Sequence, residues 1–327
     1  MKIIERWFWA FCVAAALVGL FLPGVATPLT KVIKYLLGAI LFFTGLKLDF
    51  GAALRELTRL RMVGYLAVIR LVVLPAVMYG LARLVFPEPL AVGVLIVAAM
   101  PSGAACSALT DIIHGNAALA LVGTLVTSML CPVVTPWIIE FCSGQSASGG
   151  LSFLLKQAGF LAIILFVPLS AALLLRKLYP APIDKRRDLW SALAMVSLFL
   201  LICGALASVS GDFKDMVKAT PGQAAGLCLF MCFFSAFLHT IGYLMAPWRP
   251  LADRAALSVN IAYVNNGLAI VFASQFFREI PALGAAALLP AILLEIPMDL
   301  AIVPLKAFIA RRLRRAGAGV ALKLGGP

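Results

Sequence analysis

The hydrophobic positions of the chain form long, nearly continuous stretches, separated by short connections rich in Pro, Gly or charged residues. Most stretches approach the length of about 20 residues that a helix needs to cross a bilayer. Ten can be delimited, over residues 7–27, 31–48, 62–85, 90–113, 116–140, 151–175, 189–209, 220–246, 254–277 and 282–309. The pattern predicts an all-α integral membrane protein with ten transmembrane helices.

The composition of the 327 residues leads to the same fold class. Hydrophobic residues make up 63% of the chain and charged residues 13%, with a mean hydropathy of +1.05. An average soluble protein is about 45–50% apolar and about 25% charged. The values exclude a soluble globular domain and a disordered chain. The first stretch resembles a signal peptide, but it is long and lacks a clear cleavage site, so we expect a retained helix.

The basic residues indicate how the chain is oriented. They give a net charge of +13, but they lie in connections between hydrophobic stretches, so no nucleic-acid partner is predicted. When the connections are assigned alternately to the two sides of the membrane, 18 lysines and arginines fall on one side and 6 on the other. This bias predicts a multi-pass protein of the inner (cytoplasmic) membrane. Both termini, including a basic tail over residues 311–327, are expected in the cytoplasm.

Two of the hydrophobic stretches contain helix-breaking residues near their middle. The fourth contains Pro101-Ser102-Gly103, and the ninth contains Asn260 followed by Asn265-Asn266-Gly267. Proline removes a backbone donor and glycine weakens a helix. Irregular backbone at membrane depth is tolerated only where protein buries it or where it lines a watery cavity. We therefore expect both helices to be interrupted at these points.

The interrupted stretches occupy equivalent places in the two halves of the chain. They are fourth and ninth of ten, which predicts one repeat over about residues 7–140 and a second, inverted repeat over about residues 151–310. Paired interrupted segments in corresponding halves indicate the binding site of a secondary transporter. Freed N–H groups at half-helix starts favour anions, and freed carbonyl groups favour cations. The alternative is a pair of kinks in helices that only pack.

Several short motifs resemble those of the bile acid:sodium symporter family. They are Gly45-Leu46-Lys47-Leu48, Pro101-Ser102-Gly103, Gly115-Asn116-Ala117-Ala118-Leu119, Thr135-Pro136 and Asn265-Asn266-Gly267-Leu268-Ala269. The length, the number of stretches and the places of the breaks also agree, so the resemblance covers about residues 7–310. The chain resembles a divergent, bacterial-type member of this family.

The resemblance implies a fold and a class of substrate. The chain would be a single membrane domain over residues 1–327, with a panel of helices 1, 2, 6 and 7 and a core of helices 3–5 and 8–10. Helices 4 and 9 would cross at their breaks. Known members of the family import bile acids, pantoate-like carboxylates, pyruvate or other organic anions, usually with sodium. We expect a monomer in the lipid bilayer.

The positions that the resemblance assigns to sodium depart from the family pattern. In register with the first family site stand Cys106, Ser107, Ala120, Thr124 and Asn260. In register with the second stand Arg70, Asn260 and Val264, and Tyr263 is a further ion-site position of the ninth helix. Compared with the family pattern, a thiol, a methyl group and a neutral amide replace two hydroxyl groups and a carboxylate at the first site. At the second site Arg70 and Val264 stand in place of glutamines, although a hard cation prefers oxygen ligands. The resemblance thus implies damaged sodium sites.

Three of the ionisable side chains at membrane depth are candidates for a role in transport. Arg70 is eight residues into the third stretch; it either reaches back to the cytoplasmic surface or, as the family register favours, replaces a sodium ion and helps to hold the substrate carboxylate. Glu295 and Asp299 are four residues apart on the tenth stretch, so one helix face presents both. They are candidate coupling carboxylates, with helix packing as the alternative.

The sequence therefore predicts a secondary transporter of organic anions, either bile-acid-like or small carboxylates such as pantoate, that works by alternating access with altered or absent sodium coupling. The predicted substrate-binding residues are Arg70, Ser102, Gly103, Ser107, Asn260, Asn265, Asn266 and Gly267. A conventional sodium symporter with rebuilt sites and a non-transporting sensor stay open as alternatives. An enzyme is not expected, because no nucleophile or metal motif is present. No cofactor or metal site is predicted; Na⁺ or H⁺ is the candidate coupling ion.

Overall fold

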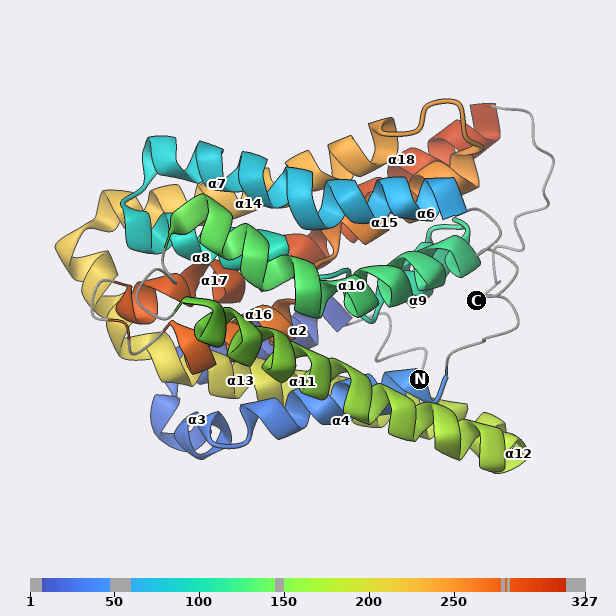
Figure 1. Cartoon of the computed structure of the whole chain (residues 1–327), viewed down its shortest axis with the longest axis horizontal. Coiled ribbons are helices and arrows are strands. Elements are labelled where there is room, and N and C mark those ends of the chain that lie inside the picture. The colour runs from blue at the N-terminus through green and yellow to red at the C-terminus, as the bar shows by residue number, and fades with distance from the viewer. Residues whose placement is uncertain (1–7, 48–59, 145–149, 278–279, 281–282, 316–327) are drawn as a thin grey trace.

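The computed structural model describes residues 8–47, 60–144, 150–277, 280 and 283–315, and within these ranges every regular element is a helix (Figure 1). An all-α membrane protein is therefore confirmed. Most of the predicted basic tail lies outside the described residues. The first half of the chain contains α2 (Phe8–Phe21), α3 (Pro23–Thr30), α4 (Ile33–Gly45), α6 (Leu60–Val68), the π-helical turn η2 (Ile69–Val73), α7 (Leu74–Val85), α8 (Glu88–Ala99), α9 (Cys106–Ile112) and α10 (Ala117–Ser143).

The second half contains the longest helices. Its elements are α11 (Gly150–Leu178), α12 (Pro180–Lys185), α13 (Arg187–Ala219), α14 (Pro221–Leu244), α15 (Leu251–Ala262), α16 (Asn266–Phe276), the 3₁₀ turn η3 (Gly284–Ala287), α17 (Leu289–Leu300) and α18 (Ile302–Arg315). The fourth predicted stretch is divided into α8 and α9, and the ninth into α15 and α16. Both breaks fall where Pro101 and Asn265-Asn266 predict them.

The number of spans is not fixed by helix length alone. In the described residues, five helical segments are long and apolar enough to cross a membrane: 61–85, 117–143, 150–178, 187–211 and 221–244. The pair α3 and α4 forms a sixth if it counts as one span, with a bend of 73° between its parts. The remaining stretches are shorter helices or interrupted pairs. The count of ten and the inverted repeats stay predictions.

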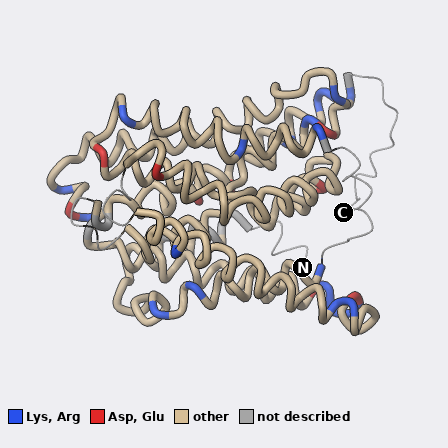
Figure 2. Tube along the Cα trace, viewed as in Figure 1, with Lys and Arg blue, Asp and Glu red and all other residues tan. Residues whose placement is uncertain are grey.

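The helices form two sides with several shorter helical pieces between them. Figure 1 shows α3, α4, α11 and α13 along one side and α6, α7, α14, α15 and α18 along the other. The pieces α8, α9, α16 and α17 lie between these sides. Lys and Arg gather toward the two ends of the molecule, and most of the middle lacks charge (Figure 2). This distribution fits helices that run between two aqueous surfaces.

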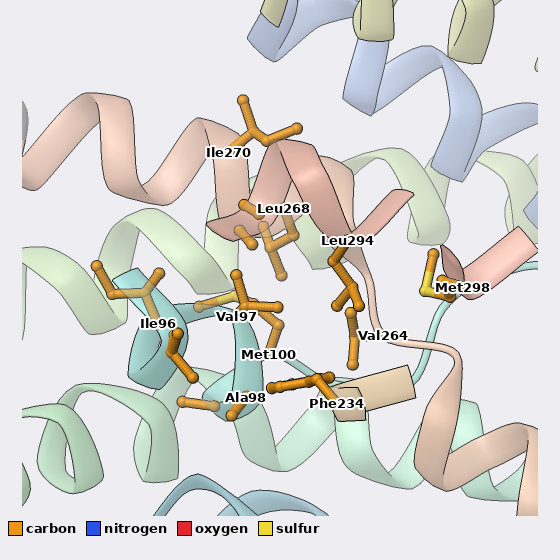
Figure 3. Packing of buried hydrophobic residues seen from close by; sticks show 14 of the residues in the cluster. Ile96, Val97, Ala98, Met100, Phe234, Val264, Leu268, Ile270, Leu294 and Met298 are labelled. Carbon is orange, nitrogen blue, oxygen red and sulfur yellow. The ribbon is translucent and has the colours of Figure 1, made fainter. Parts of the chain in front are cut away.

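The apolar core surrounds the interrupted helices. Figure 3 shows the end of α8 packed with α14, α16 and α17; the residues are Ile96, Val97, Ala98, Met100, Phe234, Val264, Leu268, Ile270, Leu294 and Met298. Every residue of α8 from Leu90 to Ala99 is buried. A helix that is apolar all round is expected to be enclosed by protein or lipid. The end of α8 is therefore enclosed by protein at the centre of the structure.

Candidate functional site

The first interruption follows directly from the local sequence. Met100 precedes Pro101, and a residue before proline is driven out of the helical region. Met100 is accordingly extended, with φ −74° and ψ 154°, and α8 ends at Ala99. The chain turns back into a helix at Cys106. The polypeptide between these points is extended or turned at the centre of the protein.

The second interruption is shaped by two consecutive asparagines. Tyr263, after α15, is extended with φ −86° and ψ 90°. Asn265 then caps α16, because its side-chain oxygen accepts a hydrogen bond of 3.1 Å from the N–H of Leu268. Asparagine is among the preferred residues for this role. The asparagine pair therefore marks the start of α16, at the predicted interruption.

The two interruptions cross and bond to each other through their backbones. Gly103 N donates to Tyr263 O at 2.7 Å, and Asn265 N donates to Pro101 O at 2.9 Å. Between them, Ser102 and Val264 form an antiparallel bridge. A Cβ atom at Gly103 would lie 3.1 Å from Val264 O, so the glycine permits the close approach. We refer to residues 100–105 and 263–266 together as the crossing.

Two adjoining cavities lie between the crossing and the side of the protein that contains α4. The first, of about 80 Å³, is lined by Leu37, Ile40, Leu41, Gly103, Ala104, Ala105, Leu198, Tyr263, Val264, Asn265, Asn266, Gly267, Glu295 and Met298. The second, of about 40 Å³, is lined by Leu41, Thr44, Gly45, Ser102, Ala104, Ser107, Leu121, Thr124, Leu125, Ser128, Leu169 and Asn265. Leu41, Ala104 and Asn265 belong to both. We call these the crossing cavities.

The crossing cavities contain backbone donors that have no partner. Within the described part of the chain, the N–H groups of Ala104, Ala105 and Gly267 make no hydrogen bond. Ala104 and Ala105 precede α9 and Gly267 lies in the first turn of α16, where N–H groups have no partner within the helix. Three unpaired donors around one cavity form an environment suited to an anionic acceptor.

Arg70 lies at the end of α8 and is fully buried, with 0% exposure. Its Nη1 donates to Ala98 O at 2.6 Å, while its Nε and Nη2 have no partner among the described residues. The carbonyl end of a helix carries a partial negative charge, so a guanidinium there is favourable. The side chain does not reach the surface of the protein, and it does not line the crossing cavities. It sits in the π-helical turn η2, a distortion that is frequent at functional sites.

Other predicted ion-site residues mostly bond to backbone carbonyl groups. Asn260 donates through Nδ2 to Ala120 O at 3.1 Å, and its Oδ1 has no described partner. Cys106 Sγ lies 3.5 Å from Tyr263 O. Thr124 Oγ1 donates to Gly103 O at 3.4 Å. Asn260 and Cys106 are buried behind the crossing, whereas Thr124 lines the second cavity.

The two carboxylates of α17 bond to the second interruption. Glu295 Oε2 accepts a hydrogen bond of 2.9 Å from Asn266 Nδ2, and Asp299 Oδ1 accepts one from the Tyr263 hydroxyl. Glu295 lines the first cavity, whereas Asp299 does not. The structure thus brings Ser102, Gly103, Ser107, Asn265, Asn266, Gly267 and Glu295 together around the crossing cavities. It places Arg70, Asn260 and Cys106 behind them.

Sequence reasoning missed the residues that complete the crossing. Thr127 Oγ1 accepts a hydrogen bond of 3.2 Å from Ser102 N, and Thr135 Oγ1 donates to Ala99 O at 2.6 Å. Thr135 belongs to a motif that was recognised, but its role was not. The apolar wall from α4 and α13, including Leu37 and Leu198, also went unpredicted. The sequence does not indicate whether a leucine in a hydrophobic stretch faces a cavity or lipid.

Comparison with known proteins places these features in a family. The sequence profile of the SBF-like CPA transporter family matches residues 6–315. The chain is 27% identical over 290 residues to a Bacillus subtilis (strain 168) protein described as an uncharacterized sodium-dependent transporter, YocS, and the match covers 85% of each. It is 24% identical over 286 residues to a protein of Oryza sativa subsp. japonica described as a probable chloroplastic sodium/metabolite cotransporter, BASS2. That match covers 85% of this chain and 65% of the rice protein.

A helical membrane protein with two interrupted helices that meet beside a cavity has the architecture of a secondary transporter. Because the profile spans nearly the whole chain, this protein belongs to the SBF-like CPA transporter family. The resemblance to bile acid:sodium symporters that its motifs suggested is confirmed. The protein is a multi-pass membrane transporter and not an enzyme.

Proposed function

We propose that this protein carries a small organic anion across the membrane and holds its carboxylate in the crossing cavities. The observation that supports this function is the set of unpaired N–H groups of Ala104, Ala105 and Gly267 around the first cavity. A carboxylate has about four acceptor positions and is able to satisfy several donors. Ser102, Ser107 and Asn265 line the neighbouring cavity, where the two serine hydroxyls donate to the carbonyl oxygens of Asn260 and Ala117.

The volume of the crossing cavities favours a small carboxylate over a molecule as large as a bile acid. They measure about 80 and 40 Å³, whereas sites for drug-sized ligands measure about 300–1,000 Å³. Apolar side chains from α4 and α13 form one wall and the crossing forms the other. Movement of one wall against the other would open the cavities to each side in turn, which is alternating access.

We further propose that Arg70 performs the electrostatic role of a coupling cation. Both relatives are named for sodium, which makes Na⁺ a plausible coupling ion for this chain. Here, however, a guanidinium already occupies the carbonyl end of α8, and Asn260 is neutral where the family register places a carboxylate. A fixed positive charge behind the crossing raises the affinity of the cavity for an anion without contact. It also disfavours a second cation there.

The test is counterflow in proteoliposomes that contain the purified protein and a high internal concentration of unlabelled carboxylate. Pantoate and pyruvate serve as small probes, and taurocholate serves as the large one. We expect saturable counterflow of a small carboxylate when choline replaces sodium on both sides. Counterflow that requires sodium would support the conventional symporter and refute the sodium-free proposal. Binding of a carboxylate without counterflow would refute transport and support the sensor.

A further inference from the structure

The first crossing cavity contains a side chain that conflicts with anion binding if it is ionised. Among its lining residues, Glu295 is the only one whose side chain carries a charge. The unpaired N–H groups proposed to hold a carboxylate line the same cavity. Two negative charges in so small a volume repel each other strongly, because the surroundings are apolar and screen them weakly. Either Glu295 or the anion must therefore be neutralised when both are present.

The contacts of Glu295 do not provide that neutralisation. Glu295 is 7% exposed, and its Oε2 accepts one hydrogen bond, from Asn266 Nδ2. In the described ranges, no Lys, Arg or His nitrogen lies within 4.0 Å of its carboxylate. An ionised carboxylate that is buried with a single neutral donor is strongly disfavoured. The neutral acid, with its O–H group, suits this environment better.

Asn266 provides an independent sign that a proton belongs at this place. The residue is 3% exposed, and its Oδ1 has no hydrogen-bond partner in the described structure, although Nδ2 of the same amide bonds to Glu295. The two ends of an amide have the same shape but opposite hydrogen-bonding character. If the amide turns over, its oxygen faces Glu295 and accepts a hydrogen bond from the protonated acid. Asn266 is thus able to pair with Glu295 in both protonation states.

We propose that Glu295 binds the proton that is coupled to anion transport. This inference rests on the proposed function, whose coupling ion it names. The carboxylate takes a proton from water on the side to which the cavity is open, and an O–H bond forms. The neutral acid then allows the anion to bind at Ala104, Ala105 and Gly267. When the cavity opens to the other side, the anion leaves and the O–H bond releases its proton to water there. One proton and one monovalent anion cross together without net charge.

Among the titratable groups on α17 and on the elements that pack against it, Glu295 is the one that lines the first crossing cavity. On its own helix, Asp299 accepts from the Tyr263 hydroxyl. On α14, His239 is engaged with Ser258, its Nδ1 lying 3.1 Å from the hydroxyl oxygen. On α8, Glu88 lies in the first turn, 3.8 Å from Arg83. The elements α2, α16 and η3 have no charged side chain. The described charged side chains of α13 and α18 do not line the crossing cavities; they are Arg187, Asp188, Lys214, Asp215, Lys218, Lys306, Arg311, Arg312 and Arg314.

The first test does not need a substrate. Infrared difference spectra of the detergent-purified protein, recorded between neutral and alkaline pH, detect the carbonyl band of a protonated carboxylic acid. We expect a band that is absent in Glu295→Gln and present in Glu88→Gln, which removes a carboxylate outside the cavity. A band that persists in Glu295→Gln and disappears in Asp299→Asn would assign the proton to Asp299 and overturn the proposal. Absence of any band in the wild type would overturn it as well.

The second test separates the proton site from the proposed function. Proteoliposomes with an inward pH gradient should accumulate the small carboxylate that shows counterflow. The affinity of the protein for this carboxylate should fall by about 5–150-fold when Glu295 is ionised at alkaline pH. Glu295→Gln should lose both gradient-driven accumulation and the pH dependence of the apparent affinity, while Glu88→Gln keeps both. If wild-type counterflow occurs but Glu295→Gln still accumulates substrate, the proton site is wrong and the function stands. If no protein shows counterflow but the band is Glu295-dependent, the function is wrong and the proton site stands.

Discussion

Arg70 donates a hydrogen bond of 2.6 Å from Nη1 to the carbonyl oxygen of Ala98, in the last turn of α8. The neighbouring carbonyl of Ala99 accepts from Thr135. These two side chains satisfy carbonyl groups that the interruption at Pro101 deprives of helical partners. A carbonyl end at the centre of a membrane protein would attract a free cation. Here a covalently attached cation already occupies that end.

The thermal stability of the wild-type protein should not depend on sodium. Exchange of sodium for choline at constant ionic strength should leave the unfolding midpoint unchanged, because Arg70 occupies the end of α8. The double variant Arg70→Gln, Asn260→Glu restores the family residues and should gain a sodium-specific rise. An ion present at 100 times its dissociation constant stabilises by about 2.7 kcal/mol. Tryptophan fluorescence during heating in detergent measures the midpoint.

Arg70→Lys is the matched control for this experiment, because it keeps the charge and should stay insensitive to sodium. A saturable, sodium-specific rise in the wild type would contradict the interpretation. In that case other oxygen atoms of the crossing bind the ion despite Arg70.

Thr135 should stabilise the same helix end independently of charge. It has 0% exposure, and its hydroxyl is the described donor to Ala99 O. Thr135→Val has nearly the same shape but no donor, and leaves this buried carbonyl unsatisfied. We expect the free energy of unfolding to fall by about 1–3 kcal/mol. Thr135→Ser, which keeps the hydroxyl, should lose clearly less. Equal losses in the two variants would show that the methyl group, and not the hydrogen bond, is responsible.

The places of the helix interruptions were predictable because their causes are local. Pro101 acts on its own backbone and on that of Met100, and Asn265 acts on an N–H group three residues later. The long stretches of hydrophobic residues fixed the helical class in the same way. Most helix bounds agree with the predicted stretches, but the first stretch is divided between α2 and α3 and the tenth between η3, α17 and α18, and a bend separates α3 from α4.

The environment of the candidate site was less predictable, because backbone atoms supply much of it. Ala98 O and the N–H groups of Ala104 and Ala105 belong to residues whose side chains give no indication of a binding site. The family register placed Arg70 near an ion site, but its carbonyl partner depends on where α8 ends in space. The pairing of Glu295 with Asn266 likewise depends on how α17 packs against α16.

Close packing of α14 against α15 should depend on Gly242. A Cβ atom there would lie 2.7 Å from Leu257 O and 2.7 Å from Ser258 Cα, both backbone atoms. Gly242→Ala should therefore force the helices apart and lower the free energy of unfolding by about 1–3 kcal/mol. Gly80→Ala is the control, because a Cβ atom at Gly80 on α7 meets nothing within 4 Å. Alanine there should be neutral or stabilising. A tolerated Gly242→Ala would mean that the two helices separate at little cost.

The backbone donor of Gly267 should contribute directly to anion binding. Gly267 is the second residue of α16, and its N–H group is unpaired in the described structure. Proline at this position removes the N–H group without removing a helical hydrogen bond, and the chain already has proline second in α7, α8 and α17. Gly267→Pro should therefore fold but bind the carboxylate more weakly. The loss of a hydrogen bond to a charged group costs about 1.5–3 kcal/mol, which is about 10–150-fold in affinity.

Gly267→Ala is the matched variant, because it adds a Cβ atom but keeps the N–H group. That Cβ atom would lie 3.3 Å from Leu37 Cδ1, at the end of a side chain that is able to shift. Counterflow measured over a range of carboxylate concentrations gives the apparent affinity of each variant. Only the proline variant should lose affinity by the stated factor if the backbone donor holds the anion. Equal losses in both would mean that crowding against Leu37 is responsible, and that the carboxylate binds elsewhere in the crossing cavities.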